Sequence, residues 1–414
     1  MKKIYQYILL VVAMVATASC SNELDDTLQP VENGTLQFVV GDFPAFGEGA
    51  QTRAIGTQDE GKTAWENGDQ IIVTLISQKY GEQAAALTYD GSSWSTEASL
   101  SYLENETPSV SVFYAPCYEV TEEGTMQLRS GMQLGMTEYL SGNYEIENGI
   151  MTITFEGAIR TYSRLRIAGL ANQTLTVTTT DFTPAGATEV ATAAYTLTTD
   201  DNGNAFLYGV FAEDATISVK QGDITLKDYT FTAEKNPNGT EHNKSYALDA
   251  TPVIDGTLGG KTEATEDDIT ALVEQLKEYV DNGITTIIVP GSEPAMIDVG
   301  SLTITAIGEA IYRLSKEESY NGKIDLVLPD VTEIVDQEFY GARALNSINL
   351  PKVTTVGDGA FYDCQYLEEL TFGSVVTAIN HKLRAEFYKV GEKVEGCDLV
   401  LNREQVNAEA DYQP

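Results

Sequence analysis

Few residues in this sequence have the types and the spacing that chemistry requires. The chain contains two histidines, His242 and His381, and neither lies near a cysteine or the other histidine at the spacing of metal ligands. The sequence also lacks the Gly-x-Ser-x-Gly word of a nucleophile elbow. We therefore expect no catalytic residue, no metal site and no cofactor.

Two segments approach known ligand-binding loops but depart from them at essential positions. The word GKT at 260–262 ends like a phosphate-binding loop, but Asp255 stands where the first glycine belongs. The word DDNGN at 200–204 is similar to the start of a calcium loop, but Ala205 and Phe211 replace the required Gly and Glu. We interpret the first segment as a linker and the second as a hairpin turn.

The chain is strongly acidic. It has 62 acidic and 25 basic residues, which gives a formal charge of −37. Such a surface repels phosphate backbones, so a nucleic-acid partner is not expected. Two of the carboxylates could form the pair of a carbohydrate-active enzyme, because such acids need only meet in space. Nothing in the sequence points to that pair, so this alternative is the least favoured.

The N-terminus has the features of a secretory signal. Lys2 and Lys3 precede an uncharged, mostly apolar run, and small residues lead into Cys20. Residues 1–19 resemble a bacterial lipoprotein signal, which implies that Cys20 carries a lipid and that residues 20–34 form an acidic tether. No later segment is long and apolar enough to cross a membrane. The resemblance thus implies an outer-membrane or cell-surface location with attachment through the lipid.

Cysteine usage does not suggest a disulfide framework. Lipidation of Cys20 would leave Cys117, Cys364 and Cys397, which is an odd number for an exported protein. We expect no disulfide among them.

Residues 35–250 have the sequence pattern of a β protein. Short runs of β-branched and aromatic residues recur at intervals near ten residues and are separated by Gly, Asn, Asp and Pro clusters. Helical periodicity is almost absent there. This pattern predicts antiparallel sandwiches, and the length suffices for two of them.

Specific words in this region resemble the fimbrillin (Mfa-like) family of surface lipoproteins. The words are QTRAIGTQDEGKTAWENGDQIIV at 51–73 and LTYDGSSW at 87–94. The resemblance implies two tandem β-sandwich domains, at 35–150 and 151–250. We interpret Trp65 as an anchor at the entry to a strand, Gly68-Asp69 as a turn, and Trp94 as a hairpin partner.

In polymerising fimbrillins a protease cuts after an arginine near the N-terminus, and subunits then exchange strands. Arg53 in the word Thr-Arg-Ala is the only basic residue between the signal and Lys62. It is the candidate cleavage site. The other interpretation is that this word is a loop feature shared by family members that never polymerise.

A linker at 251–264 leads to an amphipathic helix at 265–282. Thr265 is a suitable N-cap and Asp268 follows three residues later, as in a capping box. Asn282-Gly283 supplies the stop signal. The apolar positions with the spacing of one helix face are Ile269, Leu272, Val273, Leu276 and Val280.

Residues 265–414 contain a repeat of 22 residues. The word LPDVTEIVDQEFYGARAL begins at Leu328 and LPKVTTVGDGAFYDCQYL begins at Leu350. A weaker copy follows, and a degenerate one precedes them near residues 287 and 304. Because no single turn can bury its apolar face alone, this period predicts a stacked solenoid, with the helix 265–282 as its N-terminal cap.

The better copy resembles the BspA-like leucine-rich repeat. The positions that carry the resemblance, and that we assign to the structural repeat, are Val356, Gly357, Ala360, Phe361, Cys364 and Leu367. The preceding copy departs, with Glu338 for Ala360 and Ala342 for Cys364. A position that accepts Ala or Cys favours a small packing residue, so we interpret Cys364 as a spacer between turns and not as a reactive thiol.

The sequence favours a non-enzymatic surface lipoprotein of adhesion or recognition. Its expected fold is mainly β, with two sandwiches as a stalk and the repeats facing a ligand, such as a host matrix protein or a glycan. A fimbrial tip or accessory subunit is one form of this role. The first alternative is a polymerising fimbrial subunit that is cleaved after Arg53 and has other subunits as partners. The second is the carbohydrate-active enzyme.

Overall fold

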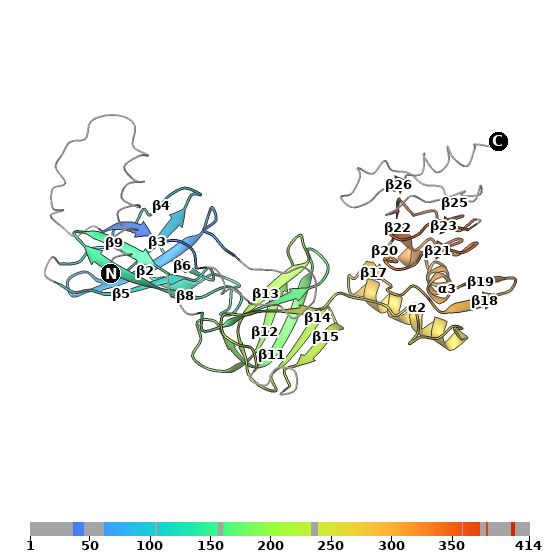
Figure 1. The fold of residues 1–414 in the computed structure, drawn as a ribbon, viewed down its shortest axis with the longest axis horizontal. Coiled ribbons are helices and arrows are strands. Elements are labelled where there is room, and N and C mark those ends of the chain that lie inside the picture. Colours follow the sequence, from blue (N-terminus) through green and yellow to red (C-terminus); the bar gives the residue numbers. More distant parts are fainter. Residues whose placement is uncertain are drawn as a thin grey trace, which may run out of the picture.

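The computed structural model describes the chain from the first β-strand to the end of the repeats, with gaps (Figure 1). The described residues are 36–44, 62–103, 106–155, 160–232, 239–357, 359–372, 378–379 and 399–401. The expectations for the signal at 1–19, the tether at 20–34, Cys20, Arg53 and His381 fall outside these residues. The described fold is mainly β, which confirms the predicted class.

The first unit is built on one seven-stranded sheet and a small two-stranded one. The large sheet has the order β1-β9-β8-β5-β2-β3-β4. In chain order, the strands of the unit are β1 (Gln37–Val40), β2 (Gln70–Ser77), β3 (Gly81–Tyr89), β4 (Trp94–Ser95), β5 (Ser109–Tyr114), β6 (Tyr118–Val120), β7 (Met126–Leu128), β8 (Leu140–Glu147) and β9 (Ile150–Thr154).

Aromatic side chains hold the core of this unit together. The Trp65 indole nitrogen donates a hydrogen bond of 2.8 Å to the Gly41 carbonyl oxygen. The Trp65 ring meets the rings of Phe43 and Trp94 edge-on, each at 4.9 Å between centroids. Trp94 lies opposite Tyr89 across the β3–β4 hairpin. The predicted roles of Trp65 as an anchor and Trp94 as a hairpin partner are confirmed.

The first sheet extends past the expected domain boundary at residue 150. Strand β9 pairs with β8, and its Met151 and Ile153 side chains are buried in the first core. The second sheet begins only at Ser163. The boundary therefore lies between Thr154 and Ser163, because a strand belongs to the core into which its side chains point.

The second unit is a seven-stranded sheet with the order β15-β14-β11-β13-β10-β16, in which β12 also pairs with β11. Strand β11 is long enough to pair with β12, β13 and β14. A register shift between Thr179 and Phe182, with Asp181 at a φ of +48°, bends the strand. Its strands are β10 (Ser163–Ala168), β11 (Thr174–Pro184), β12 (Ala191–Thr198), β13 (Asn204–Phe211), β14 (Thr216–Gln221), β15 (Ile224–Thr230) and β16 (Ser245–Asp249).

A buried ionic network lies where the two units meet along the chain. The Arg160 guanidinium donates from Nε to Glu138 Oε2 at 2.9 Å, and the Tyr162 hydroxyl donates to the same oxygen at 2.8 Å. All three residues are buried. Because a buried charge is costly without its partner, these groups hold the segment before β10 in one position.

The predicted helix is present as α2 (Glu266–Asp281). Thr265 is its N-cap, and the capping box with Asp268 is complete. Asn282 ends the helix, and Gly283 follows with a φ of +78°. Of the five apolar positions predicted on one face, Ile269, Leu272 and Leu276 are buried, and Val273 and Val280 are partly buried against the same core. The sequence signals for this helix are therefore confirmed.

The repeats form a parallel stack beyond α2. One sheet has the order β17-β20-β22-β24-β26, in which β26 is antiparallel to β24 and the other pairs are parallel, and a second sheet has the order β21-β23-β25. Leu326 pairs with Ile348 and Ile348 with Leu370, so the register advances by the predicted 22 residues per turn. The elements are β17 (Thr286–Ile288), β18 (Met296–Val299), β19 (Leu302–Thr305), α3 (Ala306–Leu314), the 3-10 helix η1 (Glu318–Tyr320), β20 (Ile324–Val327), β21 (Glu333–Ile334), β22 (Leu345–Leu350), β23 (Thr355–Val356), β24 (Glu369–Phe372), β25 (Ala378–Ile379) and β26 (Leu399–Leu401).

The degenerate first copy departs most from the repeat. Strand β17 pairs with β20 as a rung of the sheet, but the chain between them contains the β18–β19 hairpin and helix α3. This copy is therefore longer than a repeat turn, and α3 occupies the side on which later turns have only short loops.

Candidate functional site

The residues of the structural repeat lie together in the core of the stack. Val356, Ala360, Phe361 and Cys364 have no exposed surface, and Leu367 is 2% exposed. The Phe361 ring stacks on Phe339 of the preceding turn, with 5.7 Å between centroids and 8° between planes. These residues pack successive turns against one another and lie away from the surface.

Cys364 is enclosed by the preceding turn. Its Sγ donates to the Phe339 carbonyl oxygen at 2.9 Å. Burial raises the pKa of its thiol to about 12. A thiol with such a pKa is a poor nucleophile near neutral pH, which agrees with the spacer interpretation.

Glu338, the residue that replaces alanine in the first clear copy, has a role that the sequence did not reveal. Its carboxylate is fully buried and accepts hydrogen bonds from the Thr305 hydroxyl and, at 3.2 Å, from the Thr305 backbone nitrogen. Thr305 in turn caps α3 by accepting from the Gly308 nitrogen at 3.1 Å. Burial raises the pKa of Glu338 to about 7. This carboxyl group therefore links helix α3 to the repeat stack.

The outer face of the turns carries pairs of side chains in register. Tyr340 and Tyr362 stack with 5.4 Å between centroids and 11° between planes. Lys352 binds Asp330 of the preceding turn at 2.7 Å. Because their spacing is one repeat, successive turns place matching groups side by side at the surface.

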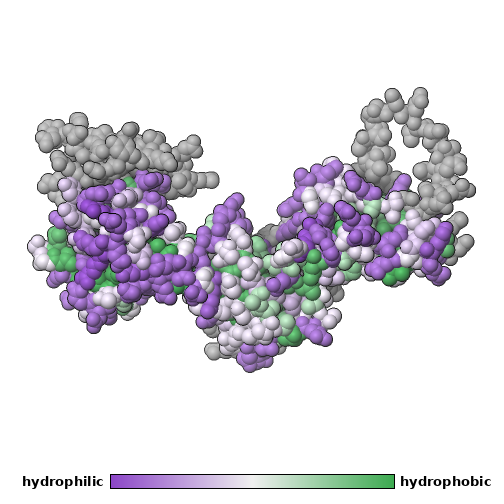
Figure 2. Space-filling model, turned by 180° about the vertical axis from the view of Figure 1, so that it is seen from behind, coloured by the Kyte–Doolittle hydropathy of each residue, from purple (hydrophilic) through white to green (hydrophobic). Residues whose placement is uncertain are grey.

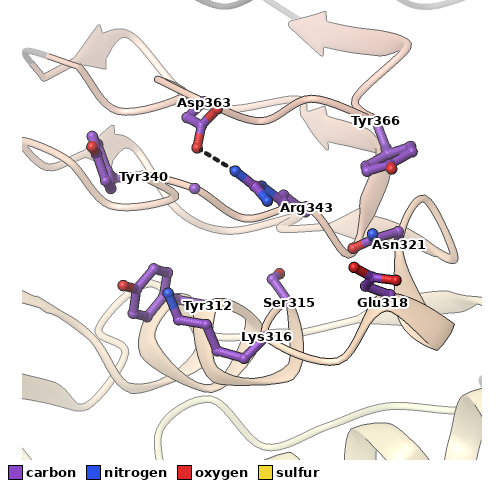
Figure 3. Close-up of a pocket in the computed structure, with 10 residues that line it drawn as sticks. Tyr312, Ser315, Lys316, Glu318, Asn321, Tyr340, Arg343, Asp363 and Tyr366 are labelled. Atoms are coloured by element: carbon purple, nitrogen blue, oxygen red, sulfur yellow. Dashed lines mark hydrogen bonds and ion pairs between the residues drawn. The ribbon is translucent and has the colours of Figure 1, made fainter.

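A groove of about 660 Å³ opens between α3 and these turns (Figure 3). Its floor comes from the helical side. Tyr312 lies on α3, Ser315 and Lys316 directly follow that helix, Glu318 lies on η1, and Asn321 lies just after η1. The Lys316 ammonium lies 3.8 Å from the centroid of the Tyr312 ring, within the range of a cation–π contact.

The opposite wall of the groove comes from two successive repeat turns. Tyr340, Gly341 and Arg343 follow β21, whereas Asp363 and Tyr366 follow β23. The Arg343 guanidinium donates to Asp363 Oδ2 at 3.0 Å across the turns, as the dashed line in Figure 3 shows. Hydrogen bonds from Gln365 and then Arg343 lower the pKa of Asp363, so this carboxylate stays ionised.

The segments that approached known ligand-binding loops have structural roles. Asp255 accepts hydrogen bonds from Thr257 and from the Gly259 nitrogen at 2.7 Å, so it closes its own turn. Asp200 accepts from the nitrogens of Asn202 and Asn204 in the turn before β13. His242 lies at the surface. Across the described residues, no group of three or more His, Cys, Asp or Glu side chains could hold a metal ion.

Figure 2 shows hydrophilic side chains over much of the visible face. No helix in the described part of the chain is long and apolar enough to cross a bilayer.

Comparison with known proteins finds a family match for one part of the chain. Residues 322–389 match the family model of the BspA type leucine rich repeat region, described as six copies. Among solved structures, a crystal structure described as "a putative cell adhesion protein" from Bacteroides fragilis matches with a TM-score of 0.30 and 14% identity. The match covers 52% of this chain and 92% of that one, and a score this low establishes no common fold. No curated protein matches the chain.

Proposed function

We propose that this chain is a non-enzymatic, cell-surface protein of adhesion or recognition, and that its repeat domain contacts the ligand. The groove between α3 and the repeat turns is the observation that carries this proposal. It combines aromatic, cationic and anionic side chains in one concave surface of the repeats. Concave sites with a few convergent polar groups are the usual places for binding.

The arrangement of the units favours a stalk that ends in a binding domain. In Figure 1 the repeats lie at the opposite end of the molecule from the first sheet. With a lipid on Cys20, fimbrillin-like sandwiches would act as the stalk and hold the groove away from the outer membrane. Helix α2 would cap the solenoid, since its apolar face is buried in the same cluster as the repeat core.

The junction between the second sheet and the repeats also suits this role. The Asp223 nitrogen donates to Asn282 Oδ1 at 2.8 Å, and Ile224 is buried with the residues of the repeat core. A junction that shares a core resists bending, so it would transmit an adhesive load from the groove to the stalk.

Beads that carry the mature chain, coupled through its N-terminus, test this function. We expect them to adhere to host cells or to immobilised matrix proteins and glycans more strongly than beads that carry a chain truncated after residue 250. Equal adhesion by the two bead preparations would refute a ligand-facing repeat domain.

The position of β1 supports a second candidate function, which is that of a polymerising fimbrial subunit. This strand precedes Arg53 and forms the edge of the first sheet, where it pairs in parallel with β9, while Leu36 and Phe43 on either side of it are buried. Cleavage after Arg53 would cut the covalent link between β1 and the rest of the unit. Departure of β1 would then open the edge of β9 to a strand from another subunit.

Mass spectrometry of surface protein separates the two candidates. A chain that begins at Ala54 and migrates as a ladder of oligomers would support polymerisation and contradict a permanently anchored monomer. A chain that begins at acylated Cys20 and remains monomeric would exclude this second candidate.

A further inference from the structure

We propose that the groove between α3 and the repeat turns is a carbohydrate site that takes a short, uncharged oligosaccharide. This inference rests on the proposed function, because it names the ligand class of the site through which adhesion would occur. Three observations lead to it: the size of the groove, its aromatic side chains and its charge balance.

The size of the groove suits a small ligand. A volume of about 660 Å³ falls within the range of sites that hold small molecules, whereas a specific protein interface covers about 800 Å² on each partner. Protein interfaces also have an apolar centre. Within described residues 265–372, the large hydrophobic side chains that are exposed are three tyrosines only: Tyr340, Tyr362 and Tyr366.

Tyrosine side chains flank the groove on both sides. Tyr340 and Tyr366 are 43% and 45% exposed, and Tyr312 lies on the helical side. Figure 3 shows Tyr312 and Tyr340 at one end of the groove and Tyr366 at the other. The face of an aromatic ring is the negative end of its quadrupole and attracts C–H groups, which a pyranose ring presents on its flatter side. The phenolic hydroxyls can also exchange hydrogen bonds with sugar hydroxyls.

The polar groups between the tyrosines include both donors and acceptors, which hydroxyl groups can pair with. The guanidinium of Arg343 offers several donors in a plane, and the carboxylate of Asp363 beside it accepts. The side chain of Asn321 also lines the groove, and an amide can both donate and accept hydrogen bonds.

The charge balance indicates an uncharged sugar. Two cations, Lys316 and Arg343, face two anions, Glu318 and Asp363, so the groove itself has no net charge. The whole chain has a formal charge of −37, which repels sialylated or sulfated glycans at a distance. A neutral oligosaccharide is not repelled by the acidic chain and needs no net charge in the groove. An acidic oligosaccharide is repelled by the chain as it approaches.

The test uses the full mature chain on a glycan array that contains neutral oligosaccharides of galactose, glucose, mannose, fucose and N-acetylhexosamines, with sialylated and sulfated counterparts. Immobilised matrix proteins stripped of glycans form a parallel arm. Tyr366→Ala and Arg343→Lys change the groove, and Tyr144→Ala serves as the matched control because Tyr144 is 38% exposed on β8, in the first unit.

We expect binding to at least one neutral glycan, a loss of tenfold or more in affinity for Tyr366→Ala and for Arg343→Lys, and no change for Tyr144→Ala. Binding only to acidic glycans, or neutral binding that both groove variants retain, would overturn the proposal. Binding only to glycan-free matrix proteins would overturn the carbohydrate class and leave adhesion standing. Absence of binding in both arms would overturn the adhesive function as well.

Discussion

Replacing Glu338 with glutamine should remove a pH dependence from the stability of the repeat domain. The carboxyl group is fully buried, and burial raises its pKa from 4.5 to about 7. The folded protein therefore holds this proton more tightly than the unfolded chain does. Its contribution to stability is complete below pH 4.5 and is lost as the pH rises towards 7 and beyond.

The size of this effect follows from the pKa change. A rise from 4.5 to about 7 corresponds to about 3 kcal/mol of unfolding free energy, lost between pH 4.5 and about pH 7.5. Glutamine mimics the protonated acid, because its NH₂ group can donate to the Thr305 hydroxyl while its oxygen accepts from the Thr305 nitrogen. We thus expect the variant to match the parent chain near pH 5 and to exceed its stability near pH 8.

Hydrogen exchange of peptides from residues 304–345, measured between pH 5 and 8 and corrected for intrinsic rates, reports this local stability. Protection in the parent chain should fall relative to Glu338→Gln as the pH rises. Glu318→Gln is a control, since Glu318 is exposed on η1. Parallel curves for the parent chain and Glu338→Gln would refute the assignment of the raised pKa to the burial of this carboxyl group.

Three further predictions concern stability. Cys364→Ala should leave ligand binding unchanged and cost at most about 1 kcal/mol, because the preceding turn has alanine at this position; loss of binding without unfolding would contradict the spacer role. Thr265→Ala should cost about 1 kcal/mol in the unfolding of the repeat domain, since it removes half of the capping box with Asp268, and restoration by Thr265→Ser would verify the cause. Glu138→Ala should cost roughly 3 kcal/mol or more in urea unfolding followed by tryptophan fluorescence, because it leaves the buried Arg160 charge without this partner; a near-neutral effect would show that the charge is satisfied elsewhere.

The sequence predicted well those features that depend on neighbours along the chain. The capping box at Thr265 involves residues three apart, and the stop at Gly283 needs only a positive φ. The repeat register was also predictable, because 22-residue spacing places equivalent apolar residues on one axis. Trp65 was predicted as an anchor and Trp94 as a hairpin partner, because both are large aromatic residues beside strand and turn signals.

Features that depend on distant residues were not predictable. Glu338 departed visibly from the repeat pattern, but its partner Thr305 lies 33 residues earlier, at the start of a helix for which the repeat gave no signal. The groove exists only because α3 meets two later turns. The boundary near residue 150 was misplaced because β9 could belong to either core until its pairing with β8 was known.

Adhesion by the double variant Tyr340→Ala/Tyr366→Ala tests the central claim most directly, because both side chains are half-exposed in the groove and outside the repeat core. Beads that carry equal amounts of the parent or the variant chain would be applied to host cells under flow, after thermal unfolding has shown that both chains are folded. We expect adhesion by the variant to fall at least tenfold. Adhesion equal to that of the parent chain would show that the groove is not the ligand-binding face.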